Sequence, residues 1–230
     1  GKDALPTLPG TTPDPTHHIP GPPNVAVLDG SGHLATEFAL LEQPGKTGDA
    51  SSFETIGIKV NFADVNAGDQ PTVSMAFKSF AYQDAQHSDV TGALSALQLQ
   101  DIAATGIKIS VVPDPHNKNT GSATLTYSIP DSAFDFLAAG ETLTLTYIVR
   151  VDNNFALNNE YTEIPIHITI TGTNDGPVIT TGAQIIAFGG GTGVSAMPLT
   201  SDDATSGTLA FRDVDLTDTC LLYTSPSPRD

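Results

Sequence analysis

The chain is poor in basic residues. Its 230 residues include 9 Lys and Arg against 26 Asp and Glu, which gives a formal net charge of −17. Nucleic-acid binding needs a basic surface that neutralises phosphates, and docking on an anionic membrane needs basic clusters, so both partners are disfavoured. The surplus carboxylates keep the chain soluble. Where they cluster, they are suited as hard oxygen ligands for a divalent cation such as calcium.

Long apolar runs are also missing. No stretch approaches the ~20 apolar residues of a membrane-spanning helix, so no membrane insertion is expected. The first residues, Gly1–Pro6, lack the apolar stretch of a signal peptide. We therefore expect either a fragment or an export signal that lies elsewhere.

Tryptophan is absent, and the only cysteine is Cys220. It opens the segment 220–230, which resembles the in-frame translation of a sequencing adapter and runs to the last residue. We expect this tail to be artefactual and exclude it from the fold prediction. Without it the chain has no thiol, which fits an exported bacterial protein, although a cysteine-free cytosolic domain would fit as well.

Motifs of the common catalytic sites are not found. There is no Gly-x-Ser-x-Gly elbow, no His-Glu-x-x-His and no phosphate-binding loop with its lysine. The glycine-rich segment 189–193 lacks that lysine and is typical of a hairpin tip. The chain is therefore predicted not to be an enzyme.

Alternating apolar residues predict many β-strands. The clearest run is 143–151, and 164–170 follows it with isoleucine at every second position. Period-two alternation places these isoleucines on a buried face and His167 on the solvent face. Several such strands joined by Gly, Pro, Asn and Asp turns favour an all-β sandwich of two sheets. Further strands are expected around 25–27, 56–62, 73–77, 107–111 and 123–129.

The segment 130–141 departs from this alternation. Its apolar residues have helical spacing and a glycine follows them, which predicts one helical turn between the sheets. We expect Phe134 and Leu137 to close the bottom of the core. Residues 1–23, rich in Pro and Gly and without periodicity, are predicted to be a disordered linker.

An internal similarity predicts two modules. Phe62-Ala63-Asp64-Val65-Asn66 matches Phe211-Arg212-Asp213-Val214-Asp215, with an offset of 211 − 62 = 149 residues. Between them, Thr171-Gly172-Thr173-Asn174-Asp175-Gly176-Pro177 ends a strand and begins a stiff connection. We expect one full module at 24–173, an inter-domain junction at 174–177 and the truncated start of a second module at 178–219.

Several of these segments resemble the VCBS repeat. The similarity is most specific over 136–178, with Gly176 where the family usually has Ala, and it is loose over 70–120. VCBS repeats occur in large bacterial surface and secreted proteins, many resembling RTX adhesins that are exported by type I secretion. The resemblance implies a cadherin-like, immunoglobulin-type antiparallel sandwich, an extracellular or cell-surface location, a role in cell adhesion and neighbouring repeats as partners.

Calcium is the cofactor that this arrangement predicts, at an extracellular module's affinity of about 10⁻⁴–10⁻³ M. In a junction similar to those of cadherins, the linker would supply Asn174 and Asp175, and the next module Asp213 and Asp215. The preceding module would add Asp135 or Glu141. By the same logic, an upstream junction would use three further residues: Asp64, Asn66 and Asp152. The alternative for Asn174 and Asp175 is an Asx turn closed by their own side chains.

The leading prediction is a non-catalytic spacer module with calcium-stiffened junctions. One alternative is a module that binds a host or matrix glycan or protein, with its site in residues 78–120. Another is a non-catalytic domain appended to a secreted hydrolase.

Overall fold

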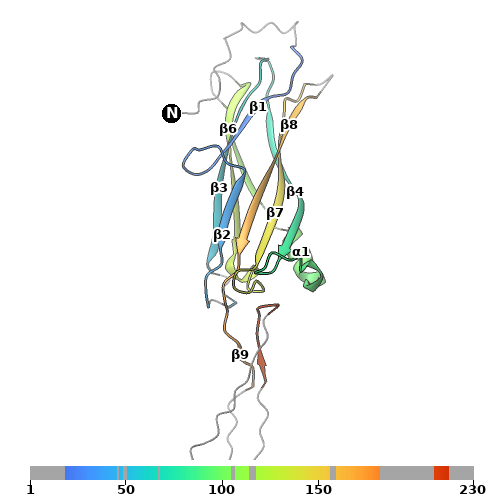
Figure 1. The fold of residues 1–230 in the computed structure, drawn as a ribbon. Coiled ribbons are helices and arrows are strands. Elements are labelled where there is room, and N and C mark those ends of the chain that lie inside the picture. Colours follow the sequence, from blue (N-terminus) through green and yellow to red (C-terminus); the bar gives the residue numbers. More distant parts are fainter. Residues whose placement is uncertain are drawn as a thin grey trace, which may run out of the picture.

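The fold is built from two four-stranded sheets that face each other across one core (Figure 1). The computed structural model describes residues 19–45, 47–48, 51–66, 68–104, 107–113, 118–155, 159–181 and 210–217. The predicted hairpin tip at 189–193, the tail 220–230 and residues 1–18 of the predicted linker lie outside these ranges.

The first sheet is antiparallel throughout. It contains Asn24–Leu28 (β1), Phe53–Ala63 (β3), Ile107–Pro113 (β5) and Thr120–Pro130 (β6). The strand order is β1-β3-β6-β5, which corresponds to the A-B-E-D sheet of an immunoglobulin sandwich.

The second sheet is mixed. It contains Glu37–Leu41 (β2), Thr72–Gln83 (β4), Thr142–Asp152 (β7) and Tyr161–Thr171 (β8), in the order β2-β8-β7-β4. The last three strands of this order match the G-F-C sheet of the immunoglobulin fold. Strand β2 adds to its edge and runs parallel to β8. The prediction of an all-β, immunoglobulin- or cadherin-like sandwich is thus confirmed, although β2 was not anticipated.

The core follows the predicted alternation. Along β7 every second side chain is at most 2% exposed, and in β8 the isoleucines from Ile166 to Ile170 are fully buried. Burying a side chain of this size contributes roughly 1.5–3 kcal/mol, so these two strands hold much of the stability. His167 lies on the outer face as predicted, where its Nδ1 is 3.0 Å from the Thr146 hydroxyl.

Two helical segments connect the sheets. After β6, the short 3₁₀ turn Asp131–Ala133 (η2) confirms the helical turn predicted within 130–141. Phe134 and Leu137, which follow it, are 2% and 0% exposed. Between β4 and β5 the chain forms Thr91–Ala93 (η1) and the helix Ala96–Ala104 (α1), which were not anticipated. Within the described part of the chain, no helix has the length and apolar character needed to cross a membrane.

The sandwich has two poles. We call the end that carries Ala63, Thr72 and Asp152 the upstream pole, and the end that carries Leu41 and Thr171 the downstream pole. In Figure 1 the upstream pole is at the top, and the chain leaves β8 at the bottom.

Beyond the downstream pole lies a third, two-stranded antiparallel sheet. Val178–Ile179 (β9) pairs with Phe211–Arg212 (β10) (Figure 1). Ile179 is opposite Phe211, just as Val25 of β1 is opposite Phe62 of β3. Phe62 and Phe211 are the first residues of the two similar sequence segments. The small sheet therefore repeats, in the same register, the pairing that begins the sandwich.

Candidate metal centre

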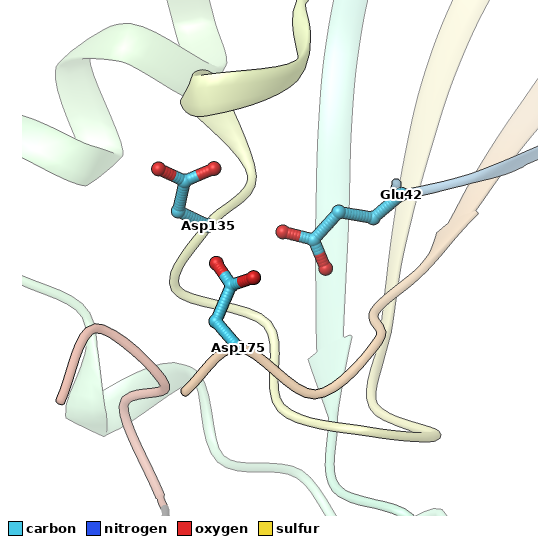
Figure 2. A group of neighbouring side chains, drawn as sticks. All are labelled: Glu42, Asp135 and Asp175. Carbon is cyan, nitrogen blue, oxygen red and sulfur yellow. The ribbon is translucent and has the colours of Figure 1, made fainter. Parts of the chain in front are cut away.

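Three carboxylates meet at the downstream pole. Glu42 directly follows β2, Asp135 follows η2, and Asp175 lies in the segment that leaves β8. Figure 2 shows the three side chains gathered at one place from these three separate segments. One oxygen from each carboxylate lies within 4.8 Å of the others, a spacing that allows a common cation between them.

The surrounding chain satisfies these carboxylates only in part. Glu42 Oε2 accepts a hydrogen bond from the Thr173 amide at 2.8 Å, and Asp135 Oδ2 accepts one from the Gly48 amide at 2.6 Å. Glu42 Oε1 has no hydrogen-bond partner, and neither carboxylate oxygen of Asp175 has one. Both residues are nearly inaccessible, with 1% and 2% exposure. Buried carboxylate oxygens without a partner are costly, and a cation bound between them would relieve that cost.

The electrostatics of Glu42 lead to the same conclusion. Burial is the largest cause that raises its pKa, and with the negative charges of Asp175, Asp131 and Asp135 it brings that pKa to about 8 against the opposing hydrogen bond from the Thr173 amide. A carboxyl group beside other carboxylates resists ionisation unless a cation compensates for the repulsion.

Asp131 is a fourth carboxylate at this pole. It is fully buried at the start of η2, and its Oδ1 accepts a hydrogen bond from the Gln43 amide at 3.0 Å. Its Oδ2 has no hydrogen-bond partner. Gln43 is the neighbour of Glu42, so Asp131 also fixes the backbone that carries a cluster residue.

The segment after β10 reaches the same pole. Asp215 is 4% exposed, and its Oδ2 accepts a hydrogen bond from the Asp175 amide at 3.1 Å. Asp213 Oδ1 accepts from the Asp215 amide at 3.2 Å, which forms an Asx turn. Asn174 is exposed, and its side-chain amide donates to the Asp175 carbonyl at 2.9 Å. Of these predicted ligands, Asp215 directly adjoins the cluster, whereas Asn174 makes a local contact.

Glu141 lies at the predicted pole, and hydrogen bonds from the chain reach both of its carboxylate oxygens. Its Oε2 accepts from the Tyr82 hydroxyl at 2.5 Å and from the Ala138 amide at 3.0 Å. Its Oε1 accepts from the Thr217 hydroxyl at 2.5 Å. Both oxygens are therefore engaged by the chain itself, and we leave Glu141 out of the candidate centre.

The predicted upstream residues are arranged differently. Asp64 Oδ1 accepts from the Asn66 amide at 2.8 Å, and Asn66 in turn holds Ile19, accepting from its amide at 2.8 Å and donating to its carbonyl at 3.0 Å. Asp152 binds Arg150 at 2.8 Å. Burial tends to raise the pKa of Asp152, but Arg150 and the Asn154 amide outweigh it and lower that pKa.

Asp64 retains some of the character of a ligand. It is 1% exposed, and its Oδ2 has no hydrogen-bond partner. Burial, followed by the charge of Asp69, raises its pKa. Among the described residues, however, the group Glu42, Asp135 and Asp175 is the only one in which three potential ligands converge.

Glu42 and Asp131 were not among the ligands predicted from the sequence. Both belong to features that alternation does not reveal, since Glu42 depends on the short parallel strand β2 and Asp131 on the turn η2. A local signal exists in retrospect: each acidic residue directly follows the last residue of a strand, Leu41 or Pro130.

Of the comparisons with known proteins, the one with solved structures gave matches. No family model matches the chain, and no curated protein matches it. It is similar to AggA, the major subunit of aggregative adherence fimbriae type I from Escherichia coli, with 11% identity, a TM-score of 0.38 and coverage of 68% of this chain and 99% of that one. It is also similar to the CooA pilin subunit from enterotoxigenic Escherichia coli, with 12% identity, a TM-score of 0.35 and coverage of 66% and 99%. Similarity at this level does not assign a function.

Proposed function

We propose that residues 24–173 are a non-catalytic module of a tandem array in an extracellular or bacterial cell-surface protein. The junction at its downstream pole would bind calcium and thereby stiffen the connection to the next module. An adhesive role and neighbouring repeats as partners follow from the resemblance to VCBS repeats. The repeated register of β1–β3 and β9–β10 supports an array, because it gives the second segment the same beginning as the first.

One observation carries the proposal: Asp175 is 2% exposed and both of its carboxylate oxygens lack a hydrogen-bond partner. The residue belongs to the linker itself, so a cation bound there would tie the linker to β2 through Glu42 and to the η2 turn through Asp135. Each of these attachments would restrict bending between the modules.

The donor set favours calcium over other ions. The converging side chains are all carboxylates, which suit hard cations, and the cluster contains no imidazole or thiolate of the kind that zinc or copper prefers. Calcium also tolerates irregular geometry better than magnesium, which demands a near-ideal octahedron. We expect affinity in the range of about 10⁻⁴–10⁻³ M.

Calcium titration of the full chain by calorimetry tests the proposal. The wild type should bind calcium in that range, and Asp175→Asn should weaken binding at least tenfold because it removes the buried charge. Asp29→Asn is the matched control: it removes one carboxylate from an Asx turn distant from the cluster.

Thermal melting provides a second readout. Calcium should raise the melting temperature of the wild type and of Asp29→Asn, and leave that of Asp175→Asn nearly unchanged. If calcium changes neither heat nor melting temperature in the wild type, or if Asp175→Asn responds as the control does, the junction does not bind calcium through this site.

A further inference from the structure

The segment after β10 makes a second set of contacts with the sandwich that uses none of the cluster carboxylates. The Thr217 hydroxyl donates to Glu141 Oε1 at 2.5 Å, and the Leu216 amide donates to the Phe136 carbonyl at 3.0 Å. Two consecutive residues of the following segment are thus bound to two acceptors on one loop of the downstream pole.

Glu141 needs no cation to be stable in this position. It is 2% exposed, and it accepts hydrogen bonds from the Tyr82 hydroxyl, the Ala138 amide and the Thr217 hydroxyl. A buried carboxylate is tolerated when donors surround it, because charge-assisted hydrogen bonds replace its hydration. The Thr217 hydroxyl is the only one of these three donors that comes from outside residues 24–173.

The core holds both acceptors in place. Tyr82 is fully buried, and its ring packs edge-on against the ring of Phe136 with centroids 5.7 Å apart. The backbone of Glu141 is fixed as well, since its amide donates to Ala138 and its carbonyl accepts from Gly172. The receiving surface is therefore preorganised, so little conformational freedom is lost when the next segment docks on it.

We propose that Glu141 and the Phe136 carbonyl form a cation-independent docking site for the first turn of the following module. From the proposed function, this inference takes only the assignment of residues 178–219 to the next module. The junction then has two separable parts: the carboxylate cluster, which requires a cation, and the Glu141 contact, which persists without one.

The residue that donates this hydrogen bond differs between the two similar sequence segments. Aligning Asp213 with Asp64 places Thr217 at the position of Gly68, 217 − 213 = 68 − 64 = 4 residues further along. Glycine has no hydroxyl, so the module at 24–173 accepts this contact from its successor but lacks the side chain to make it with a predecessor. Junctions along an array would therefore differ in how firmly they hold when calcium is low.

Amide hydrogen exchange of the full chain in chelator tests the docking site. The Leu216 amide should be protected in the wild type and in Thr217→Ser, which keeps the hydroxyl. In Thr217→Val, which keeps the size and removes the hydroxyl, it should exchange about tenfold faster or more, as expected when a hydrogen bond to a charged group is lost. Thr217 lies outside the core, so exchange within β7 should be the same in all three proteins.

The outcomes separate this inference from the proposed function. If the wild-type Leu216 amide is unprotected in chelator and becomes protected only with calcium, the docking site is wrong and the calcium junction stands. If the amide is protected while calorimetry detects no calcium binding, the docking site stands and the calcium junction is wrong. If Thr217→Ser exchanges as fast as Thr217→Val, the hydroxyl does not carry the contact and the inference fails.

Discussion

The two poles of the sandwich have a similar local backbone arrangement but differ in the side chains that it carries. At each, a pair of antiparallel strands is followed by an Asx turn, from Asp64 to Asn66 upstream and from Asp213 to Asp215 downstream. Upstream, the turn holds the incoming chain through the amide side chain of Asn66. Downstream, the corresponding carboxylate of Asp215 accepts from the Asp175 amide.

The difference lies in which groups donate hydrogen bonds to the carboxylates at each pole. At the upstream pole the Asn66 side-chain amide donates to Asp64 Oδ1 and the Arg150 guanidinium donates to Asp152, although Asp64 Oδ2 has no hydrogen-bond partner. At the downstream pole Asp175 has no such donor, and Glu42 is partly unsatisfied. Among the described residues, the chain therefore leaves more carboxylate oxygens without a donor at the downstream pole, where three carboxylates converge, than at the upstream pole. Single side chains at similar backbone positions account for this difference.

The largest loss of stability is expected from a substitution at Gly172, where neighbouring atoms of the downstream pole leave no room for a side chain. A Cβ at this position would overlap the Leu137 and Ala138 carbonyls and the Leu137 side chain. Gly172→Ala should lower the free energy of unfolding by about 3 kcal/mol, measured by urea titration. Gly57→Ala is the control, because nothing lies within 4 Å of a Cβ there. Equal stabilities of the two variants would show that the pole is loosely packed.

Calcium should stabilise one pole only. At concentrations ten- to a hundredfold above the dissociation constant, binding adds about 1.4–2.7 kcal/mol to the free energy of unfolding. Glu42→Gln should lose most of this gain, and Asp64→Asn should retain it, because Asp64 lies at the opposite pole. Urea titrations with calcium and with chelator measure both. If Asp64→Asn loses the stabilisation by calcium and Glu42→Gln keeps it, calcium binds at the upstream pole and not at the downstream one.

Without calcium, stability should fall as the pH rises. The pKa of Glu42 is about 8 in the folded chain and has its ordinary value of 4.5 when unfolded, so between these values the folded state binds the extra proton. Stability that is fully present below pH 4.5 is thus lost as the pH approaches 8. We expect a loss of at least about 1.4 kcal/mol, a tenfold or larger change in the folding equilibrium, between pH 5 and pH 8 in chelator. Glu42→Gln should flatten this profile; an equally steep profile would assign the loss to other groups.

A smaller loss of stability is expected when Asn66 at the upstream pole is replaced by aspartate, the residue found at the corresponding downstream position, 215. Asn66→Asp removes the donor that binds the Ile19 carbonyl, Asp64 and Asp69, and puts a charge beside both carboxylates. In chelator it should cost about 1 kcal/mol, and calcium should recover part of that loss. Asn24→Asp, an exposed change of the same charge, is the control. If both variants lose the same stability, Asn66 does not distinguish the poles.

The sequence was most informative where alternation is strong. The strands β7 and β8, the outward His167 and the buried Phe134 and Leu137 were all predicted, because period two and a short helical spacing are local signals. The segment around Asp175 was found because a strand, polar residues and a proline occur in immediate succession. The convergence of Asp135 and Asp175 is consistent with the predicted ligand set, which remains to be tested with calcium.

The rest depends on contacts between distant segments. The parallel strand β2 is short, and the pairing of Glu37 with His167 spans 130 positions (167 − 37), so no local pattern announces it. Glu42 was missed for this reason. The helix α1 was missed because its exposed Leu97 and Leu99 blur the apolar face that marks a helix in the sequence. The hydrogen bond from Tyr82 to Glu141 was not anticipated either, because the two residues lie 59 positions apart in the sequence.

The parallel pairing of β2 with β8 also has a mechanical consequence. The chain enters the sandwich at the upstream pole through β1, continues through β2 toward the downstream pole and leaves there from the end of β8 (Figure 1). Once β1 has separated from β3, tension along an array would draw β2 upward and β8 downward. The five paired positions from Glu37–His167 to Leu41–Thr171 would then slide past one another and share the load together. Strands pulled in shear withstand a larger force than strands separated one hydrogen bond at a time. The short edge strand β2 would therefore set the force at which the module unfolds.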